Sequence, residues 1–203
     1  MSTDDNIIPL QPPPGDFAGY IFDCDGTLAE TMHLHYQSWV HAVRLQVGQF
    51  DMEWDFFCSM GGMSTGDTIA VLNKLHGFSL NQEKLLQDVE DFLDDRLETA
   101  LPRREVIALA REVAKKGIPL SVASGGFRKY VERTLKSIGV MDLFPIVVAN
   151  EDVPRVKPAP DLFLLAAQKM GVPPEKCLVI EDSPKGRDAA DAAGMTCLLI
   201  DPK

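Results

Sequence analysis

Short apolar runs alternate with amphipathic stretches along most of the chain from Phe17 onward. This alternation is typical of a parallel β-sheet flanked by helices, because strands that are covered on both faces are apolar throughout. The runs predict five strands, at residues 20–24, 118–123, 146–149, 177–180 and 196–200. The pattern therefore predicts an α/β fold built from five strand–helix units.

Two segments between the predicted strands have clear helical periodicity. Apolar side chains recur on one helical face over residues 106–114, and Gly117 can end this helix because glycine readily adopts a left-handed backbone conformation. Residues 162–170 form the second segment, which Gly171 can end. Both segments fit the helices that connect neighbouring strands of a parallel sheet.

One long region breaks the alternation. From about Thr31 to Thr99 the sequence contains no convincing strand, only helical periodicity interrupted by glycines. Ligands of open parallel sheets bind beyond the carboxyl ends of the strands. We therefore expect a helical insertion after the first strand, placed as a candidate lid over the binding crevice.

Length, composition and charge limit the class of protein. A chain of 203 residues can bury a sizeable core, either as one large domain or as one domain carrying a smaller insertion. Its 45% hydrophobic and 25% charged residues are close to the average of globular proteins, which argues against a disordered chain. The net charge of −10 repels polyphosphates and anionic lipids, so we expect neither a nucleic acid nor a membrane as partner.

The N-terminal residues contain neither a basic segment nor an apolar segment of the kind that makes up a signal peptide. No later segment reaches the roughly 18 uncharged apolar residues that a membrane span needs, so a cytoplasmic location is expected. Residues 1–16 include three consecutive prolines and are predicted to form an N-terminal tail or surface strap. The four cysteines form no CxxC pair, so we expect reduced thiols rather than a zinc site or a disulfide framework.

Polar residues follow the predicted strands at their carboxyl ends. Because the connections of parallel strands are right-handed, these ends meet at one edge of the sheet. The residues expected there are Asp23, Asp25, Ser124, Lys157, Glu181 and Asp182. Ser124 precedes two glycines and a predicted helix, where backbone N–H groups and the helix dipole favour an anion.

Asp23 and Asp25 stand on either side of Cys24, and each carboxylate makes ionisation of the other more costly unless a cation lies between them. Several carboxylates with one ammonium suit Mg²⁺, which is commonly held by one or two carboxylates and a substrate phosphate. A carboxylate beside such a metal can attack phosphorus in line and form an aspartyl-phosphate. Cys24 itself should point away from both aspartates into the core.

Four ordered motifs give the chain a family resemblance. They are DCDGT at 23–27, Ser124 at the end of an apolar strand, Lys157 in KPAPD, and EDS at 181–183. This set resembles the motifs of the haloacid dehalogenase (HAD) superfamily of phosphohydrolases over nearly the whole chain after about Phe17. It is most similar to the subgroup with a helical cap, which includes β-phosphoglucomutase and many sugar-phosphate phosphatases. The resemblance implies a Rossmann-like α/β core of residues 17–30 and 100–203 and an inserted helical cap of residues 31–99.

The resemblance also implies roles for the residues that react with the phosphoryl group. Asp23 would be the nucleophile and a Mg²⁺ ligand. Asp25 would be the general acid and base, and its backbone carbonyl would also contact the metal. Ser124 and Lys157 would bind the phosphoryl group, and Gly125 in the same turn is expected to contact the substrate.

The remaining implied residues belong to the metal site and the hinge of the cap. Asp182 would complete the Mg²⁺ site, and Glu181 would bind the metal directly or through water. Thr31 and His35 match positions near the cap hinge that help place the acid/base residue, and we expect both on the substrate side. Members of this subgroup are often monomers, so a monomer is expected.

Differences between this sequence and the patterns of related enzymes reduce the number of reactions that the resemblance allows. A dehalogenase lacks the second aspartate of the first motif, whereas Asp25 is present here. Residues 30–43 contain no lysine, which a phosphonoacetaldehyde hydrolase would need there for its Schiff base. The loop at 61–68 has neither arginine nor lysine, although the mutase holds the second phosphate of its bisphosphate intermediate with an arginine in that loop.

The sequence therefore predicts a Mg²⁺-dependent phosphatase acting on a small phosphorylated metabolite, with sugar phosphates first and nucleotide or polyol monophosphates still open. Two alternatives stay open. One is a phosphosugar mutase, and the other is a non-enzymatic phosphate-binding module. Against the second, every motif position holds a chemically competent residue.

Overall fold

The computed structural model describes residues 7–60, 65–94 and 96–201, and these divide into two compact units. The first, here called the sheet unit, extends to Glu30 and resumes at Glu98. The second, here called the helical unit, is Thr31–Leu97. The chain thus leaves the sheet unit once, shortly after its first strand, and returns to it once.

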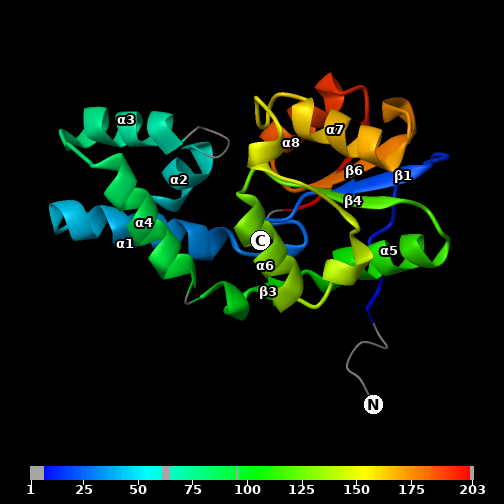
Figure 1. Ribbon diagram of the computed structural model, residues 1–203, viewed down its shortest axis with the longest axis horizontal. Helices are drawn as coiled ribbons and strands as arrows, with labels where there is room; N and C mark the ends of the chain where they lie inside the picture. The colour runs from blue at the N-terminus through cyan, green and yellow to red at the C-terminus, as the bar shows by residue number, and fades with distance from the viewer. Residues whose placement is uncertain (1–6, 61–64, 95, 202–203) are drawn as a thin grey trace, which may run out of the picture. The chain divides into compact units, whose positions relative to one another are not determined.

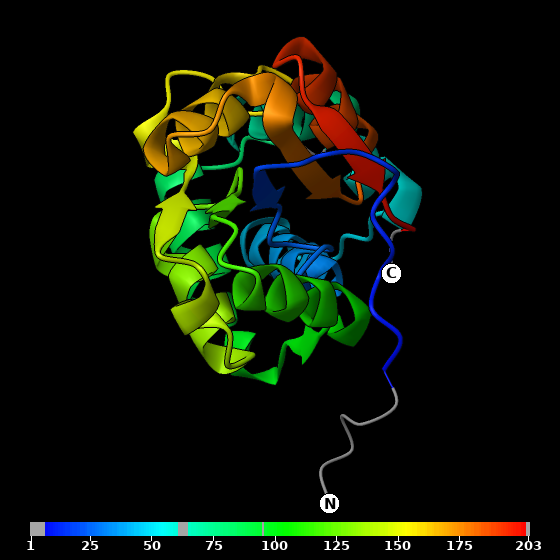
Figure 2. The same ribbon diagram turned by 90° about the vertical axis from the view of Figure 1, so that its right-hand side faces the viewer.

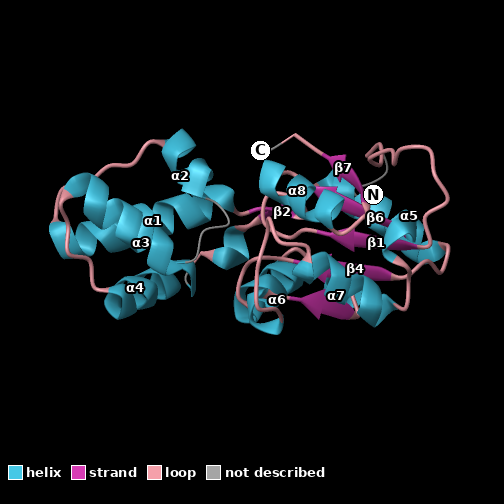
Figure 3. Cartoon of the chain, turned by 90° about the horizontal axis from the view of Figure 1, so that it is seen from above, coloured by secondary structure: helices cyan, strands magenta, loops and turns pink. Residues whose placement is uncertain are grey.

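The sheet unit contains a five-stranded, fully parallel sheet with the order β5-β4-β1-β6-β7 (Figures 1 and 3). The strands are β1 Gly19–Phe22, β4 Leu120–Ala123, β5 Ile146–Val148, β6 Cys177–Glu181 and β7 Thr196–Leu199. The predicted α/β fold is confirmed, and all five predicted strands are present with ends that differ by at most two residues. The first strand ends early because the Cys24 carbonyl accepts the N–H groups of Leu28 and Ala29, which closes a turn.

Helices cover both faces of the sheet, with α5 and α6 on one side and α7 and α8 on the other (Figure 1). Their bounds are α5 Arg104–Lys115, α6 Arg128–Ser137, α7 Asp161–Met170 and α8 Pro184–Ala192. Short 3₁₀ turns connect the other elements at Leu97–Thr99, Met141–Leu143, Asn150–Asp152 and Pro174–Lys176. Gly171 ends α7 in the left-handed conformation, as predicted.

The apolar strands bury alternate residues in two separate cores. Tyr20 and Phe22 of β1 pack in the core beneath α5 and α6, whereas Ile21 packs in the core beneath α7 and α8. The same alternation holds in β6, where Leu178 lies in the first core and Val179 in the second. Because successive side chains of a strand point to opposite faces, a strand between two helical layers is apolar at nearly every position, with buried Ser121 of β4 as an exception.

A second, two-stranded sheet was not predicted from the sequence. It pairs β2 Ala29–Glu30 with β3 Leu101–Pro102 in antiparallel orientation. Two-residue strands are too short to show an alternating pattern, which explains why the sequence did not indicate them. This short ribbon lies where the chain leaves the sheet unit and where it returns.

The described part of the helical unit contains helices and no strand (Figure 3). They are α1 Met32–Val47, α2 Trp54–Met60, α3 Thr65–His76 and α4 Gln82–Asp94, and α1 packs along α4. The predicted inserted helical region is therefore present. Half of the loop at 61–68 lies outside the described residues, which resume with Thr65 at the start of α3.

The segment before β1 forms neither helix nor strand from residue 7 to residue 18. It runs along the sheet unit near the start of α5 (Figure 2), where the Leu10 N–H donates to the Glu105 carbonyl at 3.1 Å and the Leu10 side chain packs on the core. None of the described helices is long and apolar enough to cross a membrane.

Phe144 tests how strongly the stability of the protein depends on the core beneath α5 and α6. Its ring is fully buried and meets Phe22 edge to face at 5.5 Å between centroids. We expect Phe144→Ala to lower the free energy of unfolding by about 3–5 kcal/mol, since it removes buried surface and leaves a cavity. Urea unfolding followed by circular dichroism measures this loss. Leu164→Ala, at a partly exposed position of α7, should lose much less, and equal losses would contradict the assignment of this core.

Candidate active site

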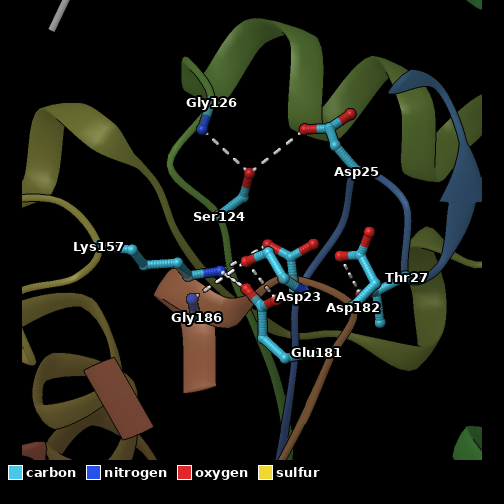
Figure 4. A network of polar contacts seen from close by, with 10 residues as sticks. Asp23, Asp25, Thr27, Ser124, Gly126, Lys157, Glu181, Asp182 and Gly186 are labelled. Atoms are coloured by element: carbon cyan, nitrogen blue, oxygen red, sulfur yellow. Dashed lines mark hydrogen bonds and ion pairs between the residues drawn. The ribbon is translucent and has the colours of Figure 1, made fainter. Parts of the chain in front are cut away.

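The carboxyl ends of three neighbouring strands bring the predicted site residues together. The central strand β1 pairs with β4 on one side and β6 on the other. Asp23 directly follows β1, Ser124 directly follows β4, and Glu181 is the last residue of β6. Figure 4 shows these side chains and that of Lys157 gathered at this edge of the sheet.

Lys157 lies between two carboxylates in the interior of the sheet unit. Its Nζ donates to Asp23 Oδ1 at 2.6 Å and to Glu181 Oε1 at 2.7 Å, and only 7% of the residue is exposed. The same ammonium lies 4.9 Å from the ring centre of Phe163. A buried ammonium is costly unless its charge is compensated. Here two carboxylates compensate it, so Lys157 is held in one position.

The pKa values follow from burial and from these ion pairs. Burial alone would lower the pKa of Lys157, but the carboxylates of Asp23 and Glu181 outweigh it and raise that pKa above its ordinary value. For Glu181, burial is outweighed by the charge of Lys157 and by hydrogen bonds from Ser183, which lower its pKa. Glu181 therefore stays ionised, with Oε2 accepting the backbone N–H of Ser183 at 2.7 Å and its hydroxyl at 2.9 Å.

Asp23 and Asp182 show that the cluster has more negative charge than Lys157 can balance. Burial raises the pKa of Asp23 well above its usual range, and the neighbouring carboxylates add to the rise despite the contact with Lys157. Burial and the charge of Glu181 raise the pKa of Asp182 to about 6. Three carboxylates around one ammonium leave an excess of negative charge, which a bound cation would offset.

Three carboxylates are close enough to share one metal ion. One oxygen from each of Asp23, Glu181 and Asp182 lies within 4.8 Å of the others. Hard carboxylate oxygens suit a hard divalent cation, a class that includes Mg²⁺, and the excess negative charge of the cluster favours binding of a cation. The side chain of Asp25 is not part of this group of three, and the contact of its backbone carbonyl with the metal stays a prediction.

Asp25 points instead toward Ser124 (Figure 4). The Ser124 hydroxyl lies 3.5 Å from Asp25 Oδ2 and accepts the Gly126 N–H at 3.0 Å. The two aspartates of the first motif thus have different surroundings, since Asp23 contacts Lys157 and Asp25 faces a neutral hydroxyl. This difference suits one group that attacks and another that transfers a proton.

The start of α6 is already paired with a protein carboxylate. The Arg128 N–H donates to both oxygens of Glu151 at 3.1 Å, and the Arg128 guanidinium pairs with Asp152 and Glu132. The backbone N–H of Arg128 therefore already has an anionic partner, whereas the anion expected at Ser124 stays a prediction. Gly125, just before it, is exposed, and its carbonyl accepts a hydrogen bond from Asn150 at 3.1 Å.

Two glycines leave the space that the carboxylates of Asp182 and Glu181 occupy. Neither glycine was singled out from the sequence. A Cβ on Gly26 would lie 2.2 Å from Asp182 Oδ2, and Gly26 also has a positive φ of 87°. A Cβ on Gly186 would lie 1.9 Å from the carboxyl carbon of Glu181. Close approaches between distant segments leave no periodic signal in a sequence, so only the structure shows why glycine stands at these positions.

Thr31 and His35 lie in the helical unit rather than in the sheet unit. Thr31 is buried and precedes α1, and its carbonyl accepts the backbone N–H of His35 at 3.0 Å. His35 is half-buried in the first turn of that helix. Their roles toward a substrate stay predictions.

The sequence of the chain is similar to those of known proteins. The sequence profile described as "Haloacid dehalogenase-like hydrolase" matches residues 20–200. Fructose-1-phosphate phosphatase YqaB of Escherichia coli (strain K12) is 31% identical over 186 residues, which are 91% of this chain and 96% of that protein. The Bacillus subtilis (strain 168) protein YhcW is 39% identical over 127 residues, which are 63% of this chain and only 58% of that protein.

The fold is also that of solved structures. CbbY from Rhodobacter sphaeroides, solved in complex with xylulose-1,5-bisphosphate, superposes with a TM-score of 0.82 over 92% of this chain and 87% of that chain. Its sequence identity to this chain is 24%. The sheet with an inserted helical region is therefore a shared architecture.

Gly186→Ala tests whether the position of the Glu181 carboxylate matters for metal binding. The added methyl group would overlap Glu181 and displace the carboxylate that also holds Lys157. We expect Mg²⁺ affinity, measured by titration calorimetry, to fall by about 10-fold to 100-fold, as is typical when a ligand loses its support. Asp188→Ala, at an exposed position of the same helix, is the matched control and should bind Mg²⁺ like the unchanged protein. Unchanged affinity in Gly186→Ala would remove Glu181 from the metal site.

Proposed function

The chain belongs to the haloacid dehalogenase-like hydrolase family, and from this premise we propose that it is a Mg²⁺-dependent phosphatase of small phosphomonoesters. Sugar and polyol phosphates are the proposed substrate class. The observation that carries this proposal is the buried contact of Lys157 with Asp23 beside the carboxylates of Glu181 and Asp182. An ammonium and a metal-binding cluster around one carboxylate suit the binding of a phosphoryl group and its attack by that carboxylate.

In the proposed first step, the Asp23 carboxylate attacks phosphorus while the bond between phosphorus and the leaving oxygen breaks. Lys157, which donates to Asp23, would bind a phosphoryl oxygen next to that carboxylate, and the Ser124 hydroxyl would donate to another phosphoryl oxygen. Asp25, in its protonated form, gives its proton to the leaving alcohol. Bound Mg²⁺, held by Asp23, Asp182 and Glu181, would supply charge stabilisation to the phosphoryl oxygens.

In the second step, water attacks the phosphorus of the aspartyl-phosphate on Asp23. The Asp25 carboxylate takes a proton from this water, and the bond between phosphorus and the Asp23 oxygen breaks. Inorganic phosphate and the free Asp23 carboxylate are formed, and Asp25 is again protonated. Asp25 thus acts as an acid in the first step and as a base in the second.

The substrate class is proposed from two sources. YqaB is named as a phosphatase of fructose 1-phosphate, and CbbY was solved with a pentulose bisphosphate, so related sites act on or bind phosphorylated sugars. The sequence at 61–68 contains neither arginine nor lysine, which favours a substrate with one phosphate. A phosphosugar mutase would have to hold a second phosphate, so we place it behind the phosphatase.

Phosphate release from a panel of sugar, polyol and nucleotide monophosphates, assayed with Mg²⁺ and with EDTA, tests the proposal. We expect release that needs Mg²⁺ and that Asp23→Asn reduces by orders of magnitude, since this change removes the nucleophile and a metal charge together. Wild-type activity in Asp23→Asn would contradict the assigned nucleophile. If no member releases phosphate, a second assay with β-glucose 1-phosphate and its bisphosphate separates a mutase from a binding module.

Asp25→Asn tests the acid/base role separately from the nucleophile. We expect kcat for a sugar phosphate to fall by about 10²–10⁴-fold, the usual contribution of a positioned proton donor. With p-nitrophenyl phosphate, whose leaving group needs no proton, the variant should release one burst of nitrophenolate per enzyme and then turn over slowly. Stopped-flow absorbance measures this burst. A near-normal kcat with the sugar phosphate would remove Asp25 from this role.

A further inference from the structure

Arg103 is a buried guanidinium at the point where the chain returns to the sheet unit. It directly follows β3, and only 4% of the residue is exposed. A guanidinium is always charged at physiological pH, so its burial is costly unless an anion and hydrogen-bond acceptors surround it. Neither its place at a helix start nor the family motifs single it out in the sequence.

The partners of Arg103 come from three separate segments. Its Nη1 donates to the carbonyl of Gly26 and to the carbonyl of Asp201, both at 2.8 Å. Its Nε and Nη2 donate to Glu105 Oε1 at 3.2 and 3.1 Å, so one carboxylate balances the charge. The backbone N–H of Arg103 also donates to the Leu28 carbonyl at 2.9 Å. Arg103 therefore binds the loop after β1 at two residues, at Gly26 through its side chain and at Leu28 through its backbone.

That loop carries the residues proposed to react. The Gly26 carbonyl belongs to the peptide that joins Gly26 to Thr27. Asp25 is the residue immediately before Gly26. The Thr27 hydroxyl donates to Asp182 Oδ1 at 3.2 Å, and Gly26 itself packs against the same carboxylate. Rotation of this peptide would therefore move Asp25, through the chain, and Asp182, through its contacts with Gly26 and Thr27.

We propose that Arg103 is a positioning residue that fixes the Gly26–Thr27 peptide, and through it Asp25 and Asp182. The expected effect of Arg103 on turnover rests on the proposed phosphatase function. Its expected effect on Mg²⁺ affinity rests on the metal site. Lysine cannot replace it fully, because the planar guanidinium directs one nitrogen to two carbonyls while the others bind a carboxylate. Arg103 does not touch the reacting atoms and acts through the loop.

Arg103→Met, Arg103→Lys and the control Arg104→Met test this role. Arg104 is the neighbouring arginine and is exposed, so the control removes the same charge at the same helix start. For Arg103→Met we expect Mg²⁺ affinity by calorimetry and kcat by phosphate release each to fall by about 10-fold to 100-fold, as for other residues that support ligands. KM should change little, because Lys157 and Ser124 are untouched. Arg103→Lys should recover part of both losses, and Arg104→Met should lose neither.

A residue that only stabilises the fold would give a different result. Arg103→Met would then unfold at a lower temperature, but the folded protein would keep normal Mg²⁺ affinity and kcat, and this outcome would overturn the inference. If Arg103→Met does not fold, Arg103→Lys decides: reduced Mg²⁺ affinity and kcat support positioning, and normal values refute it. If the unchanged protein binds Mg²⁺ but releases no phosphate, the proposed function fails, and the Mg²⁺ affinities of the variants still decide the role of Arg103.

Discussion

The ion pairs of Lys157 are the interaction on which the site depends. An ammonium that is 7% exposed is stable only because Asp23 and Glu181 meet it at 2.6 and 2.7 Å. The charge of Lys157 also offsets the repulsion between the carboxylates of Asp23 and Glu181, so both can be buried next to each other. The balance is incomplete, since the pKa of Asp23 stays raised and that of Asp182 is raised to about 6. The cluster of Asp23, Glu181 and Asp182 therefore has an excess of negative charge, which favours binding of a cation.

The sheet determines where this charge can gather. Parallel strands end at one edge, and β1 lies between β4 and β6, so the three residues that follow or end these strands become neighbours without any long loop. The apolar side chains of the strands exclude water from beneath the cluster. This is why Asp23 is almost fully buried although it lies at the end of its strand, and why Coulomb interactions there are strong.

The sequence was enough to predict the features that repeat or that match the family. The alternation of apolar and amphipathic stretches located five strands, and the order of four motifs indicated that Asp23, Ser124 and Asp182 follow strand ends and that Lys157 lies before a helix. It was not enough for features that depend on close approach between distant segments. Only glycine fits at position 186, because a Cβ there would lie 1.9 Å from the carboxyl carbon of Glu181. A sequence does not show that these two residues approach each other so closely. The two-residue strands β2 and β3 were also missed, because two residues show no period.

The loop after β1 gives the two aspartates of one motif different surroundings. The Asp23 N–H donates to the Ile180 carbonyl at 3.0 Å, which continues the sheet and fixes Asp23 beside Lys157. The Cys24 carbonyl then accepts N–H groups from residues 27–29, so the chain turns sharply and Asp25 leaves the sheet on the side of Ser124. Cys24 is buried in the core and anchors this turn from below. Although they are two residues apart in sequence, Asp23 contacts Lys157 whereas the Asp25 carboxylate faces the Ser124 hydroxyl, and this difference in surroundings supports the separate roles proposed for the two carboxylates.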